Sequence, residues 1–245
     1  MANWQDPQTT GVNAATVGVP RAARDVGLRS YMLSVYNYMA SGVLLTGIVA
    51  LLFAPYAAQV LMSPNGGMSM LGWIVTLSPL AIVFAMSFGA NRMQTGTLQM
   101  LFWAFAALMG LSMSTLFIVF TGVSIAQTFF ATAAAFLGLS LYGYTTKRDL
   151  SVFGTFLIMG VVGLLVAMLI NMFLQSSAMA LAISAIGVLL FAGLTAYDTQ
   201  RIKSMYLYVQ GTEMAGKTVI LGALTLYLDF INMFQFLLSF MGDRR

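Results

Sequence analysis

Seven apolar segments, each close to the length of a membrane span, constrain this chain more than any other feature. A helix needs about 20 mostly apolar residues to cross the hydrocarbon core of a bilayer. Only 7% of the residues are charged, whereas a soluble domain carries about 25%. The sequence therefore predicts an all-α integral membrane protein, a compact bundle of seven transmembrane helices with short connections. The expected spans are Tyr31–Ala54, Leu71–Gly89, Leu98–Phe120, Val123–Tyr144, Val152–Phe173, Ala178–Tyr197 and Val219–Met241.

Residues 1–30 differ from the rest of the chain. They are rich in Gln, Thr, Asn, Pro and Gly and show little apolar periodicity, so we expect a polar, disordered tail ahead of a membrane domain over residues 31–241. A cleavable signal peptide would place an apolar core of about 7–15 residues nearer the start. The first apolar segment is later and longer, so we expect an uncleaved span.

Basic residues occur in alternate connections between the spans. Arg92, Lys147 and Arg148 lie in two of them, and the connection before the last span is also basic, whereas the intervening connections carry no charge. Because Lys and Arg are retained on the cytoplasmic side, seven spans place the N-terminus in the cytoplasm. Arg244 and Arg245 would then lie outside. Six spans with a re-entrant last segment would bring them inside, and this alternative stays open.

The composition excludes several kinds of chemistry. The chain has no Cys and no His, so it offers no thiolate nucleophile, no zinc–thiolate site and no imidazole for proton transfer or metal ligation. We expect no enzymatic activity and no cofactor. The net charge of +4 is typical of membrane topology rather than of nucleic-acid binding.

Two aspartates fall within apolar segments. Asp229 lies near the middle of the seventh segment and Asp198 near the end of the sixth. A carboxylate in hydrocarbon costs at least ~2.5 kcal/mol and indicates a functional site. Asp198 could instead pair with Arg201 one turn away, and Asp229 could form only a structural hydrogen bond. Thr225 and Asn232 share a helix face with Asp229, and we expect this polar face to support it inside the bundle.

Paired carboxylates in a membrane suit two chemistries. Tyr197–Asp198 matches half of the intramembrane aspartyl protease signature, but the glycines required before the second aspartate are absent from residues 226–228, which argues against a protease. In a low dielectric two carboxylates cannot both ionise easily, so they titrate as a unit, and their oxygens suit Ca²⁺. We expect Asp198 and Asp229 to form a proton sensor and a transient Ca²⁺ site, provided that the sixth helix continues past Arg201 and brings them to one depth.

Arg92 is the only charge near the end of the second segment. It could anchor the topology by extending to the interface, or it could be the counter-ion of a buried aspartate. An Asp–Arg pair holds two helices together while the aspartate is ionised. Our hypothesis is that Arg92 and Asp198 form a latch that opens as the pH falls.

Several of these segments together resemble the Bax inhibitor-1 family, also called the transmembrane Bax inhibitor motif or YccA family. They are Gly193–Lys203 (GLTAYDTQRIK), Ala223–Phe236 (ALTLYLDFINMFQF), Thr146–Ser151 (TKRDLS) and the stretch from Arg92 to Gly110. The resemblance covers residues 25–241, and only the connection 204–217 looks longer than the family pattern.

This resemblance implies a seven-span protein of the bacterial inner membrane that lets Ca²⁺ leak passively in a pH-sensitive way. Asp198 and Asp229 would then match the family's aspartate pair, and Arg92 its basic latch. Bacterial relatives are also linked to a membrane-bound AAA protease. The alternative is therefore an interaction protein that modulates such a protease or a stress or cell-death response without conducting ions.

Overall fold

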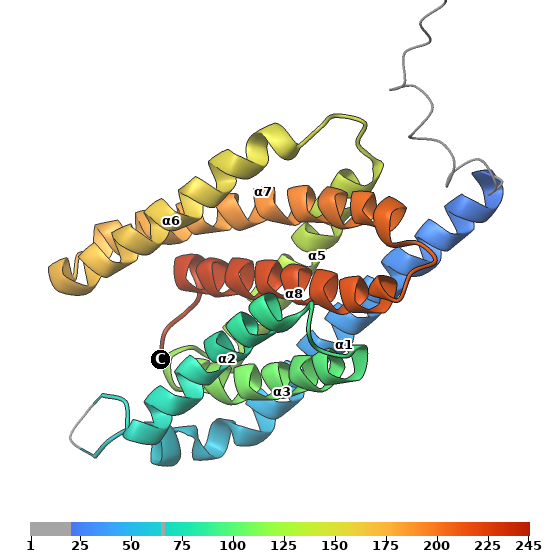
Figure 1. The fold of residues 1–245 in the computed structure, drawn as a ribbon. Coiled ribbons are helices and arrows are strands. Elements are labelled where there is room, and N and C mark those ends of the chain that lie inside the picture. Colours follow the sequence, from blue (N-terminus) through green and yellow to red (C-terminus); the bar gives the residue numbers. More distant parts are fainter. Residues whose placement is uncertain (1–20, 65–66) are drawn as a thin grey trace, which may run out of the picture.

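The computed structural model describes residues 21–64 and 67–245, and it forms the predicted bundle of seven long helices (Figure 1). All seven are long and apolar enough to cross a membrane. The all-α, seven-span prediction is therefore confirmed. The helices are α1 (Arg21–Leu61), α2 (Met70–Gly89), α3 (Thr95–Met113), α5 (Gly122–Thr145), α6 (Ser151–Leu174), α7 (Ser177–Val209) and α8 (Met214–Met241), and the single turn α4 (Leu116–Val119) completes the third span.

Helix α1 is longer at both ends than the first predicted span. It begins at Arg21, so the polar tail predicted to reach residue 30 was wrong for its last ten positions, and the rest of that tail lies outside the described residues. Leu28 packs against the core, and the ring of Tyr31 lies 5.4 Å from that of Tyr206, which anchors the start of α1. The helix also continues through Pro55, a residue that helices in membrane bundles tolerate.

Helix α7 extends twelve residues beyond its predicted end at Tyr197, as far as Val209. Its 33 residues span about 50 Å at the helical rise, which exceeds the ~30 Å hydrocarbon core. The connection to α8 therefore shortens to residues 210–213. The long connection expected over 204–217 was wrong, because its first part is a further turn and a half of α7.

Helix α8 crosses the whole bundle. It runs unbroken for 28 residues, about 42 Å, and the chain after it bonds to the segment before α5. The amide of Thr121 donates to the carbonyl of Asp243 at 3.1 Å, and the amide of Arg245 donates to that of Val119 at 2.9 Å. These contacts place the C-terminus at the end opposite the α7–α8 turn, so the re-entrant, six-span alternative was wrong.

The same helix occupies the centre of the bundle. It packs against α1, α3, α5 and α7, whereas α6 packs mainly on α7 (Figure 1). Tyr227 of α8 is fully buried against the rings of Phe102 and Phe105, and Phe230 packs edge-on against Phe136. Asp229, which lies on α8, is therefore surrounded by other helices rather than by lipid.

Candidate functional site

Asp198 of α7 and Asp229 of α8 face each other across the α7–α8 hairpin. Asp198 lies eleven residues before the end of α7 at Val209, and Asp229 lies fifteen residues after the start of α8 at Met214. The antiparallel helices therefore bring them to a similar depth, and their side chains are within hydrogen-bonding range. Only 7% of Asp198 and 4% of Asp229 is exposed.

A hydrogen bond between these carboxyl groups would require a proton. An ionised carboxylate only accepts hydrogen bonds, so one of the two must be protonated to donate. The Oδ2 atom of Asp229 is buried without a hydrogen-bond partner. The pair could therefore hold one proton between its carboxyl groups while the Oδ2 atom of Asp229 accepts from a donor or binds a cation.

Arg201 is the basic residue whose charge acts on Asp198. It follows Asp198 by one turn on the same helix, and its own side chain is exposed. Asp198 thus faces Asp229 on one side and lies within reach of Arg201 on the other. A pair within one helix cannot hold two helices together, so Arg201 is no substitute for the predicted latch.

Arg92 lies in the exposed turn between α2 and α3. Its backbone amide donates to the carbonyl of Gly89 at 2.9 Å, and among the described residues its side chain forms no ion pair with Asp198. The structure therefore brings the two aspartates together without Arg92. The Arg92–Asp198 latch stays a prediction.

Thr225 and Asn232, the predicted supporting polar face, are half-buried and bond to their own helix. The Thr225 hydroxyl donates to the carbonyl of Leu221 at 3.1 Å, and the Asn232 amide donates to that of Leu228 at 2.8 Å. Side chains of these types readily bond the carbonyl four residues back. Both therefore donate to their own helix rather than to Asp229 in this arrangement.

A row of buried hydroxyl groups on α5 was not anticipated. The side chains of Ser140 and Thr199, the neighbour of Asp198, lie 3.5 Å apart between α5 and α7. The backbones are close here, since a Cβ at Gly143 would collide with the carbonyl of Ala196. The spacing of these residues, in multiples of four, could have indicated in the sequence that they share one helix face. The buried members of the row on α5 are Ser124, Thr128, Thr132 and Ser140.

Two further side chains missed in the sequence fasten the TKRDLS segment to α7. The Gln200 amide donates to the carbonyl of Arg148 and accepts from the amide of Leu150, both at 2.8 Å. Lys203 donates to the carbonyl of Tyr144 at 2.6 Å and lies 4.8 Å from the centre of its ring. These contacts join the α5–α6 connection to the helix that carries Asp198.

Asp149 lies in the same connection and is exposed. The backbone amide and hydroxyl of Ser151 donate to its Oδ1 at 2.9 and 2.5 Å. These hydrogen bonds hold the pKa of Asp149 below its usual value. It therefore stays ionised at neutral pH and offers a control for the buried pair.

The described residues contain no group of three or more acidic, His or Cys side chains. A cation at the aspartate pair would therefore have two carboxylates, with its remaining ligands drawn from hydroxyl, carbonyl or water oxygens. Ca²⁺ takes 6–8 oxygen ligands in flexible geometries.

Comparison with known proteins supports the resemblance seen in the sequence. The pattern of the family described as "Inhibitor of apoptosis-promoting Bax1" matches residues 28–245. A protein of Rickettsia prowazekii is 47% identical over 222 residues, which cover 90% of this chain and 92% of that protein. The inner membrane protein YbhL of Escherichia coli K12 is 46% identical over 228 residues, covering 92% and 95% of the two chains.

Proposed function

The chain belongs to the Bax inhibitor-1 family, and from this premise we propose that it is a passive Ca²⁺ leak gated by protonation of Asp198 and Asp229. The observation that carries the proposal is the close approach of these two buried carboxyl groups. Ionisable groups inside a membrane bundle are costly and are typical of ion and proton pathways.

Protonation changes the net charge of the pair without moving any atom far. With one shared proton the pair carries one negative charge, and loss of that proton leaves two. Two unit charges about 4 Å apart repel by roughly 4 kcal/mol at an effective dielectric constant near 20. Gain of one proton by the fully ionised pair allows the two carboxyl groups to bond to each other and weakens their attraction for a basic partner, which would release the latch as the pH falls.

The hydroxyl row on α5 supports a path beside the pair. Its oxygens from Ser124 to Ser140 are of the kind that Ca²⁺ accepts, and they lie on the face of α5 that is buried in the bundle. Phe136 interrupts the row, and its ring lies 5.6 Å from that of Phe230, the residue after Asp229. These two rings would have to separate for an ion to pass, which makes the position next to Asp229 suitable for a gate.

The charged connections support the proposed cytoplasmic N-terminus, and similarity to the inner membrane protein YbhL supports the proposed location in the inner membrane. Lys217 donates to the carbonyl of Ala90 at 3.4 Å, and Gln200 and Lys203 hold the α5–α6 connection. The basic connections therefore gather at one end of the bundle, and the positive-inside rule assigns that end to the cytoplasm.

Calcium flux into liposomes tests the proposal. The purified protein should leak more as the pH falls from 8 to 6, by at most about tenfold per pH unit for each proton involved, because one pH unit is worth 1.36 kcal/mol. Asp229→Asn keeps the side-chain volume and removes the titration, so its leak should become nearly independent of pH. Asp149→Asn removes an exposed carboxylate instead and should behave as the wild type.

Absence of flux from well-folded wild-type protein would contradict the leak and favour the interaction role. A pH-dependent leak that survives in both Asp229→Asn and Asp198→Asn would retain conduction but assign its gating to other groups. A reporter at residue 210 and another after Gly242 would test the proposed orientation separately.

A further inference from the structure

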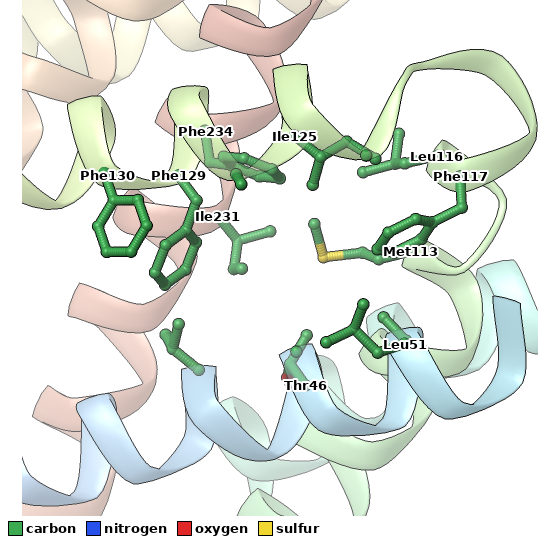
Figure 2. Close-up of a pocket in the computed structure, with 15 residues that line it drawn as sticks. Thr46, Leu51, Met113, Leu116, Phe117, Ile125, Phe129, Phe130, Ile231 and Phe234 are labelled. Carbon is green, nitrogen blue, oxygen red and sulfur yellow. The ribbon is translucent and has the colours of Figure 1, made fainter.

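An apolar crevice lies between α1, α4, α5 and α8, in the half of the bundle where α3 ends and α5 begins. Its volume is about 260 Å³, larger than the ~150 Å³ apolar cavities that accept benzene. Figure 2 shows Met113, Phe117, Ile125, Ile231 and Phe234 arranged around the empty centre, with Thr46 and Leu51 of α1 closing one side.

The lining leaves no polar group free to hold water. Thr46 contributes the only hydroxyl among the lining side chains. That hydroxyl already donates to the carbonyl of Ala106 at 2.8 Å and lies 2.6 Å from the hydroxyl of Tyr227. A buried water needs two to four polar partners. The crevice therefore suits an apolar occupant.

The crevice is continuous with the surface that faces lipid. Leu51 of α1 is 61% exposed and Phe130 of α5 is 71% exposed, and both line the crevice within membrane-spanning helices. The medium beside the apolar part of membrane-spanning helices consists of acyl chains.

We propose that the acyl chain of a membrane lipid enters between α1 and α5 and occupies this crevice. The chain would contact Ile231, two residues beyond Asp229, and Phe129, whose ring lies 5.5 Å from that of Phe230. It would thus lie against the part of α8 that follows the aspartate pair. This lipid site does not depend on the proposed leak.

Gly47 allows the crevice to be filled without disturbing the backbone. A Cβ at this position meets no atom within 4 Å, so Gly47→Leu extends a side chain into the space that the acyl chain would occupy. Gly138 of α5 is exposed away from the crevice and equally unobstructed. Gly138→Leu is therefore the matched control, and both changes favour the helix by removing a glycine.

The test uses phosphatidylethanolamine with a photoreactive diazirine in one acyl chain, reconstituted with the full chain in vesicles. Cross-links located by mass spectrometry should concentrate on residues 43–51 and 122–130 in the wild type and in Gly138→Leu. In Gly47→Leu, labelling of these segments should fall to the level of the outward face of α6. Thermal unfolding of the two variants at similar temperatures would establish that both are folded.

Two results would overturn the proposal. Labelling spread evenly over all lipid-facing helices would show that the crevice holds no chain in preference to the rest of the surface. Labelling of the crevice that is unchanged by Gly47→Leu would show that the cross-links arise outside it.

Discussion

In proteins that fold in water the most apolar helices are the most buried, but the outermost and innermost helices of this bundle show the opposite relation. The most apolar stretch of α6 has a mean hydropathy of 2.6 and is only 6% buried, whereas that of α8 has a mean hydropathy of 1.5 and is 67% buried. The less apolar helix is the central one. A lipid chain is as apolar as Leu, so burial in a membrane bundle follows packing and hydrogen bonding rather than hydrophobicity.

Polar side chains therefore mark the inside of this protein. Asp229 and the hydroxyl of Tyr227 lie on α8, while Phe153, Phe156 and Met159 of α6 are exposed. The comparison also explains why Asp229 lies on α8. A polar group on the central helix contacts polar groups of neighbouring helices, whereas one on α6 would contact lipid. Variants on the two helices should differ accordingly.

The largest expected effect on stability is that of Tyr227→Ala. Tyr227 is fully buried, its ring centre lies 4.9 Å from that of Phe105, and its hydroxyl lies 2.6 Å from that of Thr46. Removing a buried aromatic side chain costs about 3–5 kcal/mol. Phe156→Ala, on the lipid face of α6, should change the free energy of unfolding by less than about 0.5 kcal/mol. Unfolding of both variants in one detergent gives the comparison.

Tyr227→Phe separates the hydroxyl from the ring. The Thr46 hydroxyl keeps its bond to Ala106, so the loss should be only about 1 kcal/mol. Equal destabilisation by Tyr227→Ala and Phe156→Ala would contradict the central position of α8.

A smaller effect is expected at Gln200, where α7 meets the α5–α6 connection. Gln200→Ala removes two hydrogen bonds of 2.8 Å, each worth about 0.5–1.5 kcal/mol. The connection should open more often, so trypsin should cleave after Lys147 and Arg148 several times faster. Ser204→Ala, whose hydroxyl bonds only to Arg201 of the same helix, is the matched control. Equal cleavage in the two variants would show that the amide does not hold the connection.

Much of the fold could be predicted because bilayer thickness limits each span. The ends were less predictable. Pro55 and the charges after Tyr197 indicated helix ends, yet α1 and α7 continue past them. The break after Met113 was also missed, although Ser114 and Thr115 each donate a hydroxyl to a carbonyl three residues back, which competes with the helical pattern.

The burial of the candidate residues was predictable, but their contacts only partly. Carboxylates in hydrocarbon are costly enough to make Asp198 and Asp229 candidates from the sequence alone. Whether they meet depends on where α7 ends, which the sequence left open. The bonds of Thr225 and Asn232 to their own helix, and the part played by Gln200, depend on side-chain geometry that spacing does not specify.

The smallest effect on stability is expected at Arg92, because its side chain is exposed in the α2–α3 turn. Arg92→Ala should change the free energy of unfolding by less than about 0.5 kcal/mol. Its effect on calcium flux at pH 8 distinguishes the latch from a topology anchor. If Arg92 pairs with ionised Asp198, Arg92→Ala and Asp198→Asn should each raise the leak, and the double variant should leak no more than either.

Arg92→Lys provides the control, since it keeps the charge that an anchor needs and loses the planar, two-pronged contact that a carboxylate accepts. A latch should weaken in this variant, and an anchor should not. In the structure Asp198 lies within hydrogen-bonding range of Asp229, and a hydrogen bond between the two requires a proton on one of them. Pairing with Arg92 therefore belongs to the deprotonated state, and the double-variant comparison has to be made at high pH. If the increases in calcium leak of the two single variants add in the double variant at high pH, the two residues act separately. Arg92 would then only fix the orientation of α2 in the membrane.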